Sequence, residues 1–112
     1  MKYLIVMCLM MPALNVRAEF VSGNQLRGWI RESEKIDSGV RHDLLKAGQA
    51  MGYIQGVYDT LKSVTVCSPP GITVGQIERI VIKYFDENPE VWNISADRIV
   101  SAALSKAFPC KQ

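Results

Sequence analysis

The stretch RHDLLKAGQAMGYIQGVYDTLKS, residues 41–63, decides the fold class of this chain. Charged and amide side chains alternate in it with apolar ones, so it predicts an amphipathic helix and not a membrane span. Such a helix needs other elements to cover its apolar side. Its apolar residues recur at intervals of three and four, as on one helix face; they are Leu44, Leu45, Met51, Ile54, Val57, Tyr58 and Leu61.

Three glycines of this stretch, Gly48, Gly52 and Gly56, fall every fourth residue and therefore share one narrow face of the predicted helix. Each glycine inside a helix costs about 1 kcal/mol relative to alanine. We expect another helix, or another segment of the chain, to lie very close to this face. The alternative is a locally weakened helix that makes no special contact there.

The flanking segments also predict helices. A capping-box pattern stands at Ser22–Gln25 and again at Thr73–Gln76, and helical apolar spacing follows each. Ser95 can cap a last helix, and the helix before it should end ahead of Pro89. We therefore predict an all-α fold, a compact single-domain bundle of about four helices. The core residues expected in these three helices are Leu26, Trp29, Ile30, Ile77, Ile80, Val81, Tyr84, Phe85, Ile99, Val100, Ala103, Leu104 and Ala107.

The first 18 residues have the pattern of a secretory signal peptide. Lys2 gives a positive start, residues 3–14 are almost wholly apolar, and the segment 16–18 places small residues where a signal peptidase cleaves. We predict cleavage after Ala18 and a mature domain of residues 19–112. A membrane anchor is one alternative, although the apolar run is well short of the about 20 residues that a spanning helix needs. A lipoprotein carrying its lipid on Cys8 is another.

Loss of the signal peptide changes the charge and the cysteine count. Lys2 and Arg17 account for the net charge of +2, so the mature chain is neutral overall. A neutral domain has no long-range attraction for nucleic acid or an anionic membrane. The remaining cysteines, Cys67 and Cys110, predict a disulfide in an exported chain, with two free buried thiols as the alternative. Together with the single His42 they supply too few ligands for a metal site.

No pattern typical of an enzyme is present. His42 stands beside Asp43, and no free cysteine would remain as a nucleophile for it to activate. Asp86 and Glu87 are adjacent acids near a predicted helix end, which is typical of a solvated surface. The sequence has no glycine-rich phosphate loop and no cofactor motif. We therefore predict a binding protein without a cofactor.

The run GYIQGVYD, residues 52–59, resembles the G-Y-I-x-G-x-x-D core of the Rap/Tai-type immunity proteins. Three further elements follow in the order of that family: CSPPGIT at residues 67–73 with Gln76, then Tyr84-Phe85 with Pro89 close behind, and AFPC at residues 107–110. The resemblance covers nearly the whole mature chain. It implies a small, helical, periplasmic protein that binds and blocks a peptidoglycan-cleaving amidase delivered by a type VI secretion system.

Two functions stay open beside this resemblance. The first is the immunity protein, which would inhibit its amidase by occluding the substrate cleft. The second is a small periplasmic chaperone of the acid-stress kind, also helical and built around one disulfide, which should unfold or dissociate near pH 2. The neutral charge and the apolar surplus of so small a chain are compatible with a homodimer, and some relatives are dimers.

We expect the partner-binding site in the loop between the third and fourth helices. Pro89 stiffens this loop, so it should lose little entropy on binding. Trp92 lies outside the predicted apolar stripes, and aromatic anchors of this kind dominate protein interfaces. Two alternatives remain: Trp92 folds inward and closes the core, or the loop from Cys67 to Ile72 is the contact surface. The expected contact residues are Asp86, Glu87, Glu90 and Trp92.

Overall fold

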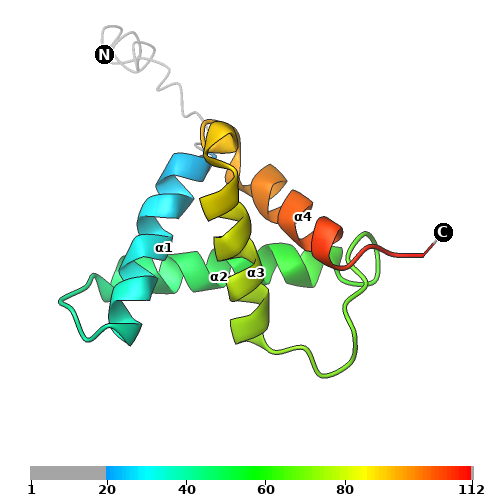
Figure 1. The fold of residues 1–112 in the computed structure, drawn as a ribbon, viewed down its shortest axis with the longest axis horizontal. Coiled ribbons are helices and arrows are strands. Elements are labelled where there is room, and N and C mark those ends of the chain that lie inside the picture. The colour runs from blue at the N-terminus through cyan, green and yellow to red at the C-terminus, as the bar shows by residue number, and fades with distance from the viewer. Residues whose placement is uncertain (1–19, 112) are drawn as a thin grey trace, which may run out of the picture.

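A computed structural model describes residues 20–111, so the predicted signal peptide of residues 1–18 lies outside the described residues. Within them the chain forms helices and no strand. These residues form four α-helices, and Figure 1 shows how the helices and the short connection between the last two are arranged. The predicted all-α bundle is confirmed. The elements are α1 (Gly23–Asp37), α2 (Leu44–Leu61), α3 (Val74–Glu87), the 3-10 helix η2 (Pro89–Val91) and α4 (Ala96–Ala107).

Hydroxyl side chains named from the sequence begin two of the helices. Ser22 Oγ accepts a hydrogen bond from the backbone N–H of Gln25 (3.1 Å) at the start of α1. At the start of α3, Gln76 N donates to Thr73 Oγ1 (3.2 Å) and Thr73 N donates to Gln76 Oε1 (2.8 Å), which confirms that capping box. Ser95 stands at the predicted N-cap of α4, but its hydroxyl donates to the Asp97 carboxylate and caps no backbone group.

The second half of α2 packs against the core through residues of the predicted apolar pattern, Ile54, Val57, Tyr58 and Leu61, whereas the first half departs from it. The buried residues of α2 are Ala47, Ala50 and Ile54, and α1 packs against this helix more extensively than against any other helix. Leu44 and Leu45, which the spacing placed on the apolar face that other elements should cover, are 70% and 73% exposed. That prediction was wrong, because small alanines let α1 approach closely and the two leucines project away from the contact.

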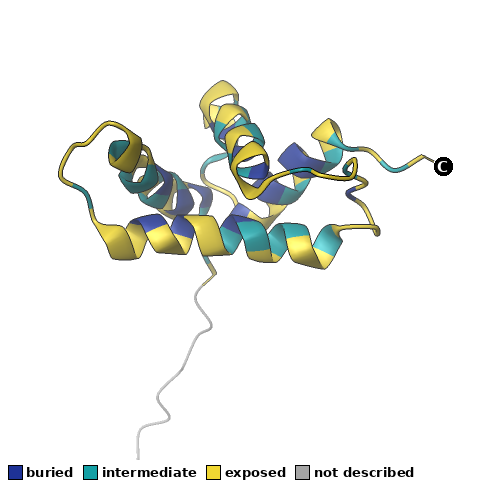
Figure 2. Cartoon of the chain, turned by 90° about the horizontal axis from the view of Figure 1, so that it is seen from below, coloured by how far each residue is buried: buried dark blue, intermediate teal, exposed yellow. Residues whose placement is uncertain are grey.

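The core lies between α2 and the three other helices. Figure 2 shows these helices gathered on one side of α2, whose opposite side is exposed. Most of the predicted core residues are buried or pack against the core, whereas Met51 and Ala107 are exposed. The largest fully buried side chains are Phe85, Leu26, Ile30, Ile54, Ile99, Leu104, Val66, Val81 and Val100.

The glycine face of α2 is open within residues 20–111. Gly48, Gly52 and Gly56 are all exposed, and a Cβ added at any of them would meet no heavy atom within 4 Å. The expected close contact of another helix or segment with this face is therefore wrong for the described chain. The physical reason is that α1 packs on the neighbouring alanine face, which already allows a close approach.

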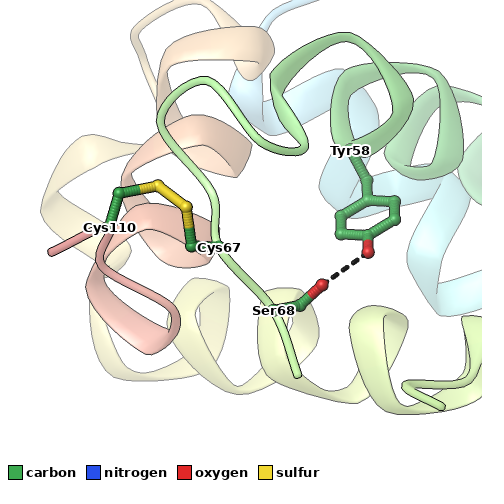
Figure 3. Close-up of a disulfide and its surroundings, with 4 residues drawn as sticks. All are labelled: Tyr58, Cys67, Ser68 and Cys110. Atoms are coloured by element: carbon green, nitrogen blue, oxygen red, sulfur yellow. Dashed lines mark hydrogen bonds between the residues drawn. A yellow bond between two sulfur atoms is a disulfide. The ribbon is translucent and has the colours of Figure 1, made fainter. Parts of the chain in front are cut away.

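A disulfide joins Cys67, just after α2, to Cys110 at the end of the chain (Figure 3). The two Cα atoms lie 4.9 Å apart across a sequence separation of 43 residues, and Cys67 N donates to Phe108 O (2.9 Å). A hydrogen bond of 2.6 Å between Tyr58 Oη and Ser68 Oγ holds the following segment against α2. The predicted disulfide is confirmed, and closing a loop of this size is worth roughly 4 kcal/mol in the chain-entropy model.

Candidate partner-binding site

The connection from α3 to α4 is a hydrogen-bonded structure and not an open loop. Val91 N donates to Asn88 O (3.2 Å), and Trp92 N donates to Pro89 O (3.3 Å). The Asn88 side-chain amide donates to Tyr84 O (2.8 Å), so the same residue also fastens the connection to the last turn of α3. Each bond removes conformational freedom before any partner arrives. We call residues 86–95 the α3–α4 loop; this range includes Asp86 and Glu87, which lie in the last turn of α3.

The start of α1 supports this loop from the other side. The first N–H groups of a helix have no partner inside the helix. Here Gly23 N donates to Ile94 O (2.8 Å), and Asn24 N donates to Trp92 O (2.7 Å). The loop therefore supplies the missing acceptors of α1, and α1 in turn fixes two carbonyl groups of the loop.

This junction depends on glycine at position 23. A Cβ on Gly23 would lie 2.6 Å from Trp92 O and 2.9 Å from Trp92 Cα, and it would also overlap the Ile99 side chain. The obstacle is mainly backbone, which cannot move aside as the end of a flexible side chain can. At residue 23, α1 thus lies very close to both the loop and α4.

Trp92 is half-buried and packs against the core. Its indole Nε1–H donates to Phe85 O (2.8 Å), so the polar end of the ring is satisfied at the end of α3. The guanidinium of Arg27 lies over the ring, 5.5 Å from its centroid, within the range of a cation–π contact. The ring thus closes one end of the core and exposes only part of its surface.

The three acids of the predicted site have different surroundings. Asp86 Oδ1 lies 2.9 Å from Arg27 Nη2, and the side chain of that arginine is only 15% exposed. Glu87 lies 3.8 Å from Lys83, and both of these side chains are well exposed, so this pair is weak. Glu90 is exposed and forms no ion pair with any residue between 20 and 111.

The residue that sequence reasoning missed is Arg27. It follows the buried Leu26 in α1, and nothing in the local pattern separates it from the exposed arginine at position 31. Its partners Asp86 and Trp92 are far away in the sequence, so only the fold brings them together. A buried arginine is recognisable from a structure but not from the amphipathic pattern of a single helix.

Two other surfaces of the molecule contain hollows and are considered beside the α3–α4 loop. The segment from Cys67 to Ile72, the rival contact surface, lines a shallow hollow together with Tyr58 and Lys62. A second hollow lies between α2 and α4 and is lined by Gly52, Tyr53 and Gly56 of α2 and by Asp97 of α4. Burial raises the pKa of the Tyr53 phenol, and the nearby Asp97 carboxylate raises it further.

The remaining candidates for chemistry stay apart. His42 Nδ1 lies 2.8 Å from Val40 O at the entrance to α2, far in sequence from the disulfide. Between residues 20 and 111 no three histidine, cysteine or acidic side chains lie close enough to hold a metal ion. In the same part of the chain, no helix has both the length and the apolar character needed to cross a membrane.

Comparison with known proteins places this fold in a family. The family model of the Rap1a immunity proteins matches residues 22–110, which is nearly all of the described chain. The match includes every helix, both cysteines of the disulfide and the whole α3–α4 loop. Comparison with curated proteins finds no match at a significant level. On the strength of the family model, the chain belongs to the Rap1a immunity proteins.

Proposed function

We propose that this protein is a periplasmic immunity protein that binds and blocks a peptidoglycan-cleaving amidase, with no chemistry of its own. The family supports the immunity role. The single observation that carries the choice of site is the α3–α4 loop, which is hydrogen-bonded on itself and to α1 before any partner binds. A loop with few conformations can enter a cleft with little loss of entropy.

The position and charge of the loop suit this role. It stands at one end of the bundle, where α3 turns into α4 (Figure 1). Its acids Asp86, Glu87 and Glu90 and the half-buried Trp92 form the proposed contact set. An acidic loop would meet the basic rim of a cleft that binds cell-wall peptides, and complementary charge raises the association rate. The inhibition that we propose is occlusion of the cleft.

The periplasmic location belongs to the same proposal. The pattern of residues 1–18 supports export, with a mature domain of residues 19–112. The Cys67–Cys110 disulfide supports it as well, because structural disulfides persist in oxidising compartments such as the periplasm. An amidase delivered into the periplasm would meet its inhibitor there.

The test uses the mature protein and the purified product of any amidase gene found beside its own. We expect tight binding by calorimetry and complete loss of peptidoglycan hydrolysis at one inhibitor per active site. Absence of both binding and inhibition would overturn the proposal. The chaperone alternative makes a different prediction: the protein would suppress the aggregation of unrelated periplasmic proteins near pH 2 and would leave the amidase active.

A further inference from the structure

We infer that Arg27 is a positioning residue for the α3–α4 loop. It holds Asp86 and Trp92 from the side of α1, and it thereby leaves Glu87 and Glu90 as the acids that meet a partner. This inference rests on the proposed function for its binding consequence, while its structural part stands independently. It divides the four expected contact residues into two that shape the loop and two that face outward.

The geometry of the guanidinium carries the first part. One nitrogen, Nη2, lies 2.9 Å from the Asp86 carboxylate, and the central carbon Cζ lies over the Trp92 ring, 5.5 Å from its centroid. A second nitrogen, Nη1, lies 3.6 Å from the Glu34 carboxylate. A planar, forked cation can serve an acid and a ring at once, which an ammonium group cannot do. Arg27 therefore fixes a side chain at each end of the loop.

Burial of this cation argues against a purely space-filling role. The Arg27 side chain is 15% exposed, and its Nε and Nη1 atoms are buried without a hydrogen-bond partner among the described residues. Leaving donors unsatisfied in the interior costs free energy. A leucine or methionine would fill the same volume without that cost, so what the arginine adds is a fixed charge and a fixed direction.

The attachment through Arg27 adds to the one made by the backbone. Gly23 and Asn24, one turn earlier in α1, donate their N–H groups to Ile94 O and Trp92 O. One helix thus holds the loop at its carbonyl groups and at two of its side chains. Both attachments must break before the loop can change shape, which keeps the bound conformation populated in the free protein.

The acids of the loop that Arg27 does not neutralise determine which kind of partner the loop can bind. The Arg27 guanidinium neutralises Asp86, whereas Glu87 has only the exposed Lys83 at 3.8 Å. Glu90 has no cation within ion-pair distance among residues 20–111. The partner chemistry that fits is a protein cleft with cationic groups or hydrogen-bond donors on its rim, spaced to meet two carboxylates on either side of Pro89.

The experiment compares Arg27→Met with Arg31→Met in the mature protein. Both substitutions remove one positive charge from α1, but Arg31 is exposed and forms no ion pair among the described residues. The first readout needs no partner. In ¹H–¹⁵N spectra, the exchange of the Trp92 indole N–H and of the Asn24 amide should speed up at least tenfold in Arg27→Met and stay unchanged in Arg31→Met.

The second readout is the association rate with the neighbour-encoded amidase. If Arg27 acted only through its charge, both variants would be more negative and would associate equally fast or faster than the parent. A positioning role predicts the opposite sign for one of them: about tenfold slower association for Arg27→Met, with Arg31→Met at or above the parental rate. Arg27→Lys, which keeps the charge but not the planar fork, should recover only part of the loss.

The outcomes separate the two claims. Equal indole exchange in Arg27→Met and Arg31→Met would overturn the positioning role, whatever the amidase does. Faster indole exchange in Arg27→Met alone, together with a parent protein that does not bind the amidase, would support the positioning role and overturn the proposed function. If Arg27→Met does not fold, Arg27→Lys provides the same comparison, and parental indole exchange and association in it would overturn the need for a planar fork.

Discussion

Two regions of this molecule contain helical glycines in opposite surroundings. At the closed end, where α1 meets the α3–α4 loop, Gly23 is buried, and a single methyl group would strike the backbone of Trp92. On the open face of α2, Gly48, Gly52 and Gly56 have free space around them within residues 20–111. The lone glycine is the one that packing requires, and the regularly spaced ones are not. Spacing alone therefore says little about close contact, which the neighbouring elements decide.

The largest effect should come from the closed end, at Trp92. Replacing it by alanine removes the packing of the ring on the core and its hydrogen bond to Phe85 O. For a half-buried ring we expect a loss of about 2–4 kcal/mol in the free energy of unfolding. Urea unfolding measures it, with the exposed Glu90→Ser as control. A loss below about 1 kcal/mol would show that Trp92 does not close the core.

Gly23→Ala should be the next largest. The added methyl group must displace the Trp92 backbone or part the loop from α1, at a cost of about 1–3 kcal/mol. Alanine is otherwise the better helix former, so an isolated helix would gain stability from this change. Thermal unfolding gives the sign. A variant as stable as the parent would mean that α1 and the loop are not held at this distance.

On the open face, Gly52 tests the opposite expectation. Gly52→Ala should raise the free energy of unfolding by up to about 1 kcal/mol, since the helix gains propensity and nothing is in the way. Gly52→Leu should be tolerated nearly as well. A sharp loss for leucine but not for alanine would mean that another surface covers this face.

Light scattering on the same two Gly52 variants addresses the homodimer, which stays a proposal. If the parent is a dimer and Gly52→Leu is a monomer, a second copy covers the open face of α2. A dimer that survives this substitution would use another surface. A parent that stays monomeric at high micromolar concentration would end the homodimer proposal.

The smallest effect concerns Glu78 of α3, which lines a separate hollow with Met51 and Ile36. Burial raises the pKa of its carboxyl above 4.5, and a hydrogen bond with Gln55 partly opposes this. The folded state therefore favours the protonated acid, and the stability from this group is lost as the pH rises through the folded pKa.

Glu78→Gln should therefore be slightly more stable than the parent at pH 7, by less than about 1 kcal/mol because the group is only partly buried and solvent still screens it. The advantage should shrink as the pH falls toward 4.5, where the parent carboxyl becomes protonated. Unfolding curves between pH 4 and pH 7 measure it. An advantage that does not depend on pH would assign the effect to helix propensity.

Most of the fold could be predicted from short-range features of the sequence. The hydroxyl of Thr73 begins α3, Pro89 follows its end, and the cysteine pair predicted the disulfide, since each of these acts within a few residues or by a simple count. The packing side of the first half of α2 could not be predicted in the same way. Alanine contributes little to an apolar pattern, although the alanines of this helix are buried. Leucine contributes strongly to such a pattern, although Leu44 and Leu45 are exposed.

The position of the candidate site in a loop could be predicted from the sequence, but the separate roles of its residues could not. The sequence places Pro89 and the acids together, but the roles of Asp86 and Trp92 depend on Arg27 of another helix. A charged residue on an amphipathic helix carries no local mark of a tertiary partner. Only the packing of α1 against the α3–α4 loop shows which acid is already neutralised.

The central claim is that the partner binds Glu87 and Glu90 of the α3–α4 loop and does not bind the open glycine face of α2. It is tested by the affinity of the neighbour-encoded amidase for the double variant Glu87→Ser, Glu90→Ser, measured by calorimetry beside Gln49→Ser on α2. We expect the double variant to lose at least tenfold in affinity at an unchanged melting temperature, and Gln49→Ser to bind like the parent. Parental affinity in the double variant, with a loss for Gln49→Ser, would contradict the account.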